Sequence, residues 1–428
     1  MDVAEVVAPA ATDLLVLSTA GSVDDGKSTL IGRLLHDTRA ILEDQLEHVE
    51  ATSRARGDHR LDLALVTDGL RAEREQGITI DVAYRSFTTP RRRFVIADTP
   101  GHVQYTRNMV TGASTTDLAV VLVDARVGLT EQSRRHLSIA ALLHIPHVVV
   151  AVNKMDLVGW SQPRFAEVRD EFAQLARELA IDEVVYVPVS ALHGDNVVEP
   201  SANLAWYGGP TLLRHLEDVP VVDDRAGGPA RLPVQWVIRP HTDRRPDYRA
   251  FAGQLASGRL AVGDPVIALP SGHATTVTAI DVGGEPIPEA AAPLSVAVQL
   301  ADHLDVCRGT MLAAAKVPPP IVGHDLSALV CWMGDAQLAE RTTYALKHTT
   351  RTVRARVEEI TSALDLASGR HDPAVASLGP NDIGRIRVRS AAPIVYDPYA
   401  TDRVTGSFVL IDEVTDATVA AGMLLPPA

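Results

Sequence analysis

The sequence predicts an α/β domain with a mostly parallel sheet, followed by two antiparallel β-barrels. Short apolar runs alternate with helical patterns over residues 1–220, and this alternation is typical of a parallel sheet with helices on both faces. A phosphate-loop (P-loop) pattern directly follows the first apolar run, as it does in nucleotide-binding α/β domains. From residue 230 onward, short β-branched runs and turn signals replace the helical patterns, which is typical of barrels.

Five apolar runs mark the expected strands of the α/β domain, at 14–20, 94–97, 119–123, 147–152 and 184–189. Helical periodicity begins between Leu30 and Leu35 and recurs at 131–143 and 163–180. Because crossover helices join parallel strands, polar residues that follow these strands should meet at one edge of the sheet, where ligands bind.

Two breaks divide the rest of the chain. The polar, glycine-rich stretch 221–231 predicts a linker, and the proline run from Val317 to Pro320 predicts a second boundary. We therefore expect one barrel over residues 230–316 and another over residues 321–428. The expected strands are 234–238, 265–269, 274–280 and 295–300 in the first barrel, and 327–333, 351–360, 384–389 and 406–412 in the second.

The composition disfavours several classes of protein. The 428 residues carry a net charge of −14, which is unfavourable for a bulk nucleic-acid or anionic-membrane binder. No apolar run reaches the roughly 18 residues of a membrane-spanning helix, and the first residues lack the basic segment of a signal peptide. Cys307 and Cys331 have no metal-ligand spacing. We expect a cytoplasmic protein with two reduced thiols that binds neither nucleic acid nor membrane.

The stretch GSVDDGKST matches the phosphate-loop pattern G-x-x-x-x-G-K-[ST]. Its glycines let successive backbone N–H groups point at phosphate oxygens, and the following helix presents its positive end to the same anion. Lys27 is a compact cation for the β- and γ-phosphates, and the Ser28 hydroxyl can bind Mg²⁺. The expected nucleotide-binding residues are Gly21, Ser22, Val23, Asp24, Asp25, Gly26, Lys27, Ser28 and Thr29.

A second motif, VNKMD at residues 152–156, predicts which base is bound. The Asp156 carboxylate can accept two hydrogen bonds from guanine N1 and N2, whereas adenine offers no such donor pair. We expect Asn153 to brace the phosphate loop and to contact guanine N7, and the Lys154 stem to cover the base.

The next strand ends in a turn at Ser190, Ala191 and Leu192. The backbone N–H of Ala191 can donate to guanine O6, while Ser190 shapes the turn. An N-K-x-D sequence alone also occurs in ordinary surface turns, but its position after a buried strand favours guanine recognition. The expected ligands are therefore GTP and Mg²⁺.

The stretch ADTPGH supplies the expected sensor of the γ-phosphate. Asp98 is a second anchor for Mg²⁺, and the Gly101 N–H can contact the γ-phosphate. His102 can orient or polarise the attacking water. The expected contacts in this stretch are Asp98, Thr99, Pro100, Gly101 and His102.

A mobile loop is expected to complete the metal site. Within EREQGITID, Gly77 gives conformational freedom and Thr79 can bind Mg²⁺ while the γ-phosphate is present. Chemistry of this type depends on positioning and charge neutralisation. We therefore expect His102, Lys27 and Thr79 to be catalytic. The expected metal ligands are Ser28, Thr79 and Asp98.

Together, D-T-P-G-H, N-K-x-D and G-I-T-I resemble the translational GTPases of the elongation factor Tu and 1-alpha group. Asp25 stands where translation factors of that group usually carry histidine or serine. More narrowly, the sequence is similar to the large, GTPase subunits of bacterial sulfate adenylyltransferase. The stretches that carry this similarity are TDGLRAEREQGITIDVAYR (67–85), ADTPGHVQYTRNMVTGAST (97–115), LKHTTRTVRARV (346–357), NDIGRIRVR (381–389) and DPYATDRVTGSFVLID (397–412).

This resemblance implies a GTPase subunit that pairs with a smaller catalytic subunit. In such enzymes the smaller subunit joins ATP and sulfate into adenosine 5′-phosphosulfate and diphosphate, and GTP hydrolysis drives this uphill reaction of sulfate assimilation. Some members carry a fused adenylylsulfate kinase. Because this sequence contains no second phosphate loop, it does not predict kinase activity, unless the natural protein is longer than this sequence.

Two other functions stay open from the sequence. The chain could be a translation factor that delivers aminoacyl-tRNA through a local basic patch, although Asp25 and the barrel stretches favour the sulfate adenylyltransferase family. It could also be a GTP-dependent scaffold without catalytic turnover. Stimulation of GTP hydrolysis by the smaller subunit or by ribosomes separates the first two functions. The sequence does not indicate the subunit interface, the stoichiometry, the hydrolysis trigger or an arginine finger.

Overall fold

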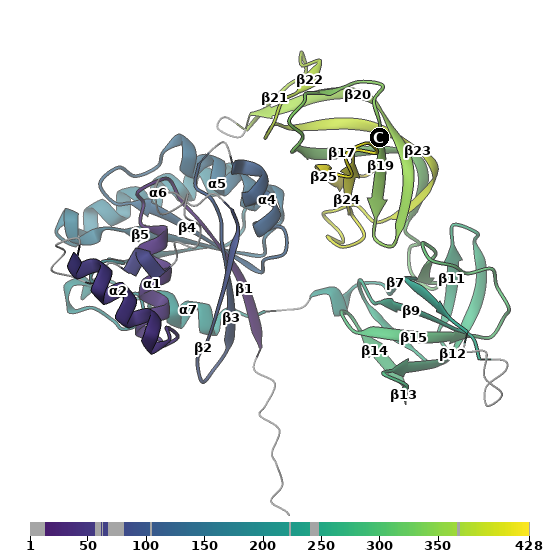
Figure 1. The fold of residues 1–428 in the computed structure, drawn as a ribbon, viewed down its shortest axis with the longest axis horizontal. Helices are drawn as coiled ribbons and strands as arrows, with labels where there is room; N and C mark the ends of the chain where they lie inside the picture. Colours follow the sequence, from purple (N-terminus) through teal and green to yellow (C-terminus); the bar gives the residue numbers. More distant parts are fainter. Residues whose placement is uncertain are drawn as a thin grey trace, which may run out of the picture. The chain divides into compact units, whose positions relative to one another are not determined.

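The computed structural model describes residues 13–55, 61, 63–66, 81–102, 105–221, 224–239, 248–365 and 369–427. These residues form two compact units that divide near Val221. The first unit contains a sheet covered by helices, and the second contains only short helical turns and antiparallel strands (Figure 1). The predicted fold class is thus confirmed.

A six-stranded sheet with strand order β2-β3-β1-β4-β5-β6 organises the first unit. All neighbours pair in parallel except β2 and β3, which are antiparallel. The sequence predicted the five parallel strands but missed β2, whose outward residues are largely exposed and polar. The strands are β1 (Leu14–Ala20), β2 (Ala83–Thr88), β3 (Arg93–Asp98), β4 (Leu118–Asp124), β5 (His147–Asn153) and β6 (Val184–Pro188).

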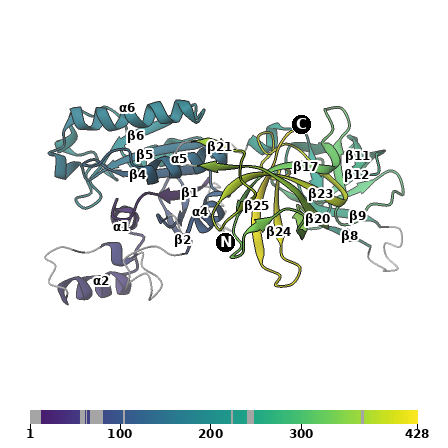
Figure 2. The same cartoon turned by 90° about the horizontal axis from the view of Figure 1, so that it is seen from above.

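Helices cover both faces of this sheet. On one face, α1 and α7 pack against inward-pointing residues such as Leu15 and Leu17. Helices α4, α5 and α6 lie on the other face (Figures 1 and 2). The helices are α1 (Lys27–Asp37), α2 (Glu43–Ala55), α4 (Thr106–Ala113), α5 (Glu131–Leu142), α6 (Gln162–Glu178) and α7 (Leu212–Asp218), with single 3₁₀ turns η1 (Leu63–Val66), η3 (Met155–Val158), η4 (Ala202–Leu204) and η5 (Asp224–Gly227).

Side-chain caps fix where three of these helices begin. Thr130, Ser161 and Thr211 each accept a hydrogen bond from the backbone N–H three residues further on. Such a cap stabilises a helix by about 1 kcal/mol. The parallel register then brings Thr19 beside Asp98 and Asp124 beside Asn153, so the polar residues that end the strands meet at one edge.

The second unit begins with a curved antiparallel sheet. Its order is β7-β16-β11-β12-β15-β9-β8, and an isolated bridge between Arg231 of β7 and Ser257, just after β9, brings the two sides of the sheet together into a partial barrel. The stretch predicted as a linker contains the turn η5, and Arg231 already belongs to β7. The strands are β7 (Arg231–Pro233), β8 (Trp236–Ile238), β9 (Ala250–Gln254), β10 (Arg259–Ala261), β11 (Pro265–Leu269), β12 (His273–Val282), β13 (Glu285–Ile287), β14 (Glu289–Ala291), β15 (Ser295–Leu300) and β16 (Met311–Ala314).

The final barrel is closed by hydrogen bonds. Its strands follow the order β19-β24-β25-β17-β23-β20, and β20 pairs with β19 to complete the ring. Alternate residues of these strands point into one apolar core. The strands are β17 (Ile321–Trp332), β18 (Leu338–Ala339), β19 (Thr343–His348), β20 (Arg351–Asp365), β21 (Arg370–Asp372), β22 (Ser377–Leu378), β23 (Ile383–Tyr396), β24 (Ser407–Ile411) and β25 (Thr418–Leu424).

A buried ion pair connects the two barrels. Arg231, which is only 1% exposed, donates from Nε and Nη2 to the Asp397 carboxylate at 3.0 and 3.1 Å. Its Nη2 also donates to the Pro318 carbonyl oxygen, and the Thr405 hydroxyl donates to Asp397. Removing one partner of such a pair typically costs about 3–5 kcal/mol, so this contact holds the barrels together.

Candidate functional site

The phosphate loop connects β1 to α1 in the way that its sequence predicts. Gly26 has a φ of 97°, in the left-handed region, and a Cβ at this position would lie 2.5 Å from Asn153 Nδ2. Both the backbone angle and the close approach therefore require glycine. Helix α1 begins at Lys27 without a side-chain cap, so its first N–H groups can bind an anion.

Lys27 lies buried under the loop, and its Nζ donates to the Gly21 carbonyl oxygen at 3.4 Å. Burial lowers the pKa of Lys27, while the Asp98 and Asp25 carboxylates oppose that change. A Cβ on Gly101 would lie 2.8 Å from this Nζ and 2.2 Å from the Gly21 oxygen. The segment after β3 and the phosphate loop thus converge on the same ammonium group.

Asp25 stabilises the curl of the loop. Its Oδ2 accepts a hydrogen bond from the Ser22 N–H at 2.6 Å, and the side chain is buried. Burial raises the pKa of Asp25 to about 6, although the Ser22 hydrogen bond and Lys27 favour the charged form. Val23 and Asp24 are exposed at the tip of the same loop.

The N-K-x-D motif braces this loop. Asn153 Nδ2 donates to the Asp25 carbonyl oxygen at 2.7 Å, and Lys154 Nζ donates to the Asp24 carbonyl oxygen. Lys154 also pairs with Asp124 at 3.0 Å. Although burial would raise the pKa of Asp124, hydrogen bonds from Arg126 and Lys154 outweigh it and hold that pKa at about 2. The motif therefore sets the shape of the phosphate loop.

The Asp156 carboxylate is held in place by the turn after β6. Ser190 Oγ donates to Asp156 Oδ1 at 2.7 Å, and His193 Nε2 lies 3.7 Å from Oδ2. The Ala191 N–H donates to Asn153 Oδ1 at 2.9 Å, so a contact with guanine O6 would share this donor. The turn thus joins both parts of the motif that the sequence assigned to the base.

Arg33 of α1 also holds the turn after β6 in place. Its Nε donates to the Ala191 carbonyl oxygen at 3.1 Å, and its Nη2 donates to the Leu192 carbonyl oxygen at 2.8 Å. These bonds connect the phosphate helix to the turn beside Asp156. The sequence did not indicate this role, because one more arginine on an amphipathic helix resembles any solvated side chain.

The proposed metal ligands supply oxygen atoms, which Mg²⁺ prefers. Asp98 is 3% exposed and accepts a hydrogen bond from Thr19 Oγ1 at 3.2 Å. Thr99 Oγ1 donates to the Thr19 carbonyl oxygen at 2.6 Å, which fixes the backbone beside Asp98. Ser28 lies in the first turn of α1. Thr79 and Gly77 lie outside the described residues, so their predicted roles stay predictions.

The segment after Asp98 is held by α5. Pro100 and Gly101 are buried while His102 is exposed. Gln132 Nε2 donates to the Gly101 carbonyl oxygen at 2.6 Å and lies 3.2 Å from His136 Nε2. Burial, together with the charge of Lys27, lowers the pKa of His136 to about 3. His136 is therefore neutral and can accept a hydrogen bond from Gln132.

Sequence reasoning missed the roles of Gln132, His136 and Asp124. Gln132 and His136 lie four residues apart on a helix, a spacing that many amphipathic helices share. Asp124 ends a fully buried strand at the same edge as Asp98 and Asn153, and that position is a signal that could have identified it. Among the described residues, no helix is long and apolar enough to span a membrane.

The comparisons with known proteins place the chain first in a class. The sequence model of the elongation factor Tu GTP binding domain matches residues 12–223. The model described as GTP-eEF1A C-terminal domain-like matches residues 325–425. A solved structure of Sup35 complexed with GDP is 23% identical with a TM-score of 0.44, over 100% of this chain and 97% of that chain. The two sequence-model matches identify the chain as a GTPase of the translational superfamily.

Two curated relatives narrow this class. "Sulfate adenylyltransferase subunit 1" of Aeromonas hydrophila is 50% identical over 96% of this chain and 86% of its own length. "Bifunctional enzyme CysN/CysC" of Mycobacterium tuberculosis is 56% identical over 97% of this chain, which spans 67% of the relative's length. The chain belongs to the sulfate adenylyltransferase subunit 1 family.

Proposed function

We propose that this chain is the GTP-hydrolysing subunit of a sulfate adenylyltransferase. It couples GTP hydrolysis to the synthesis of adenosine 5′-phosphosulfate and diphosphate from ATP and sulfate, which a smaller catalytic partner subunit carries out. The observation that carries the proposal is the arrangement of a phosphate loop beside the ordered Asp156 carboxylate, in a chain of this family.

The base is selected by Asp156. Its Oδ1 already accepts from Ser190, and the remaining lone pairs of the carboxylate can accept from guanine N1 and N2. An adenine in the same position would leave these acceptors unpaired, which is how a polar site rejects a wrong ligand. Asn153, Lys154, Ala191 and Leu192 complete the pocket for the base.

The phosphates are bound by residues 21–29, with Lys27 as the cation and Ser28 and Asp98 as Mg²⁺ ligands together with Thr79. When bound, Mg²⁺ neutralises charge that develops on the phosphate oxygens. Gly101 contacts the γ-phosphate through its N–H, and Gln132 fixes the same peptide through its carbonyl. His102, next in the chain and exposed, orients the attacking water.

The alternative function, delivery of aminoacyl-tRNA, has weaker support. Asp25 replaces the histidine or serine usual in translation factors, and its buried carboxylate holds the Ser22 N–H within the loop. The name of the Aeromonas hydrophila relative, sulfate adenylyltransferase subunit 1, also favours sulfate activation. A GTP-dependent scaffold would bind GTP without hydrolysing it. Single-turnover hydrolysis tests that function directly.

The test is reconstitution with the smaller catalytic subunit. Phosphosulfate formation from ATP and sulfate should rise on addition of GTP, and Lys27→Ala should remove this dependence because the triphosphate loses its cation. Lys316→Ala is the matched control, since Lys316 is an exposed lysine in the second unit. The proposal would be contradicted if GTP did not change the rate of phosphosulfate formation, or if the Lys27→Ala variant kept the full GTP-dependent increase.

A further inference from the structure

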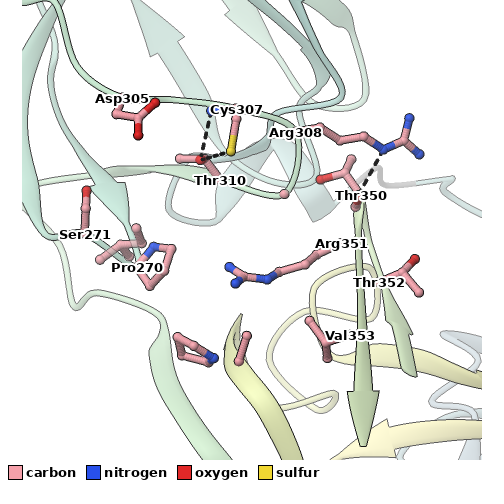
Figure 3. A pocket seen from close by; sticks show the side chains of 14 residues that line it. Pro270, Ser271, Asp305, Cys307, Arg308, Thr310, Thr350, Arg351, Thr352 and Val353 are labelled. Atoms are coloured by element: carbon pink, nitrogen blue, oxygen red, sulfur yellow. Dashed lines mark hydrogen bonds between the residues drawn. The ribbon is translucent and has the colours of Figure 1, made fainter. Parts of the chain in front are cut away.

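A pocket of about 850 Å³ opens in the second unit, between its two barrels (Figure 3). One wall is formed by Pro270 and Ser271 and by the loop 305–310 that precedes β16. The other wall is formed by residues 350–353 at the beginning of β20. This volume lies within the range of small-molecule sites, roughly 300–1,000 Å³. The GTPase residues described above all belong to the first unit, so this pocket is a separate feature.

Arg351 places a positive charge inside this pocket. Its guanidinium points into the hollow (Figure 3). Within the part of the chain that the structure describes, this side chain makes no hydrogen bond or ion pair. An unpaired guanidinium in a concave site is a favourable partner for an anion, because it offers several N–H donors in a fixed plane.

The position of Arg351 is set by its neighbours. Gly309 has a φ of 92°, and a Cβ there would lie 3.2 Å from both Cβ and Cγ of Arg351. The arginine stem therefore packs directly against the glycine backbone. Arg308 lies at the rim, where its Nε donates to the Thr350 carbonyl oxygen at 3.2 Å. The Arg351 stem is thus held against the loop, while the Arg308 guanidinium is directed away from the hollow and contributes charge only at the rim (Figure 3).

The lining also suggests what kind of ligand fits. The two guanidinium groups outnumber the single lining carboxylate, Asp305, in a chain whose net charge is −14. Pro270, Pro393 and Val353 add apolar surface. A bare tetrahedral oxyanion would fill only a small part of this volume, so the apolar wall can cover an attached organic group.

We propose that this inter-barrel pocket binds a small molecule that carries one phosphate- or sulfate-type oxyanion. Arg351 receives the oxyanion inside the pocket, and Arg308 adds positive charge at the rim. Free inorganic oxyanions and their organic monoesters share this chemistry. The proposal goes beyond GTP binding and hydrolysis and does not depend on them.

Cys307 provides a reporter within the pocket. Its thiol is exposed and lines the site, whereas Cys331, the other cysteine, is buried. Burial raises the pKa of Cys331 to about 12, and a protonated, buried thiol does not react with alkylating reagents. The rate at which iodoacetamide modifies Cys307 therefore measures how open the pocket is.

The experiment measures Cys307 alkylation by peptide mass spectrometry in the full chain saturated with GDP. Inorganic sulfate, inorganic phosphate and adenosine 5′-monophosphate are the probes, and chloride at matched ionic strength is the reference. At least one probe should slow alkylation about fivefold or more at saturation. Arg351→Gln should raise the probe concentration that gives half-maximal protection about tenfold or more, as expected for a lost charged hydrogen bond. Arg354→Gln, an exposed arginine of the same strand outside the pocket, should keep it.

The three probes identify the source of the oxyanion. Stronger protection by the monophosphate than by inorganic phosphate indicates an organic ester, and equal protection indicates the free ion. Arg351→Lys keeps the charge, so it should retain part of the protection and shows that loss in Arg351→Gln is not unfolding. Protection no better than chloride, or full protection in Arg351→Gln, would overturn the proposal.

Discussion

Replacing Asp156 with asparagine should change which base the site prefers. The Asp156 side chain is only 9% exposed. Water therefore cannot easily replace a hydrogen bond that this carboxylate fails to make with a bound base. Ser190 Oγ donates to Oδ1, and the amide oxygen of an asparagine can accept the same bond. The variant should therefore keep the geometry of the turn and alter only the group that faces the base.

The size of the effect follows from the lost hydrogen bonds. Two bonds from guanine N1 and N2 to a carboxylate each contribute about 1.5–3 kcal/mol. The asparagine amide offers one acceptor oxygen and one NH₂ group. Because the NH₂ group is itself a donor, it cannot accept a hydrogen bond from guanine and places two donors against each other. GTP affinity should fall by about 10²- to 10⁴-fold, since every 1.4 kcal/mol is a factor of ten. Xanthosine triphosphate, which carries an oxygen at position 2, should bind better than it does to the original chain.

The assay is isothermal titration of GTP, ATP and xanthosine triphosphate into both proteins. Asp170→Asn is the matched control, because Asp170 is an exposed carboxylate of α6 and should change nothing. Unchanged GTP affinity, or an equal loss for GTP and xanthosine triphosphate, would show that Asp156 does not read the base.

Three further predictions concern the phosphate side of the site. His102→Ala should keep GTP affinity but slow single-turnover hydrolysis about 10²-fold or more, and an unchanged rate would exclude His102 from the reaction. Gln132→Ala removes the 2.6 Å bond to the Gly101 oxygen, so GTP affinity should fall about 3- to 10-fold while GDP affinity stays constant; fluorescence titration that shows equal losses for both would contradict this role. The raised Asp25 pKa, about 6 against 3.8, means that the folded chain holds this proton more tightly than the unfolded chain. Its contribution to the free energy of unfolding is thus favourable below pH 3.8 and is lost as the pH rises through about 6. Without nucleotide or metal, Asp25→Asn should raise the free energy of unfolding at pH 7.5 by about 1–3 kcal/mol, and this gain should shrink toward pH 4. Urea unfolding at both values measures the difference, and a gain that does not vary with pH would refute the assignment.

The parallel strands of the first unit could be predicted because they are buried on both faces. All seven residues of β4 are buried, and such continuous apolar runs stand out in a sequence. Strand β2 could not be predicted in this way, because its alternating residues are exposed at the sheet edge. Strands β19 and β25 of the final barrel were also missed, because polar residues at exposed positions of β19 and the small residues of β25 do not form a continuous β-branched run.

The site residues that could be predicted are likewise those that lie close together in the sequence. Phosphate loop, N-K-x-D and D-T-P-G-H residues lie close in sequence, so their spacing could be recognised. Arg33 and Ala191, by contrast, are 158 positions apart, and Gln132 reaches Gly101 across 31 positions. Only the fold brings such pairs together, and a single arginine or glutamine on a helix carries no pattern that identifies its partner.

The most direct test of the account is steady-state GTP hydrolysis by the purified chain with different partners. Turnover should rise when the smaller catalytic subunit, ATP and sulfate are present together, and it should stay at the basal rate when any one of them is omitted. Ribosomes supplied with aminoacyl-tRNA should leave the rate of GTP hydrolysis unchanged. Stimulation by ribosomes, or no response to the smaller subunit with both substrates, would contradict the coupling of this GTPase to sulfate activation.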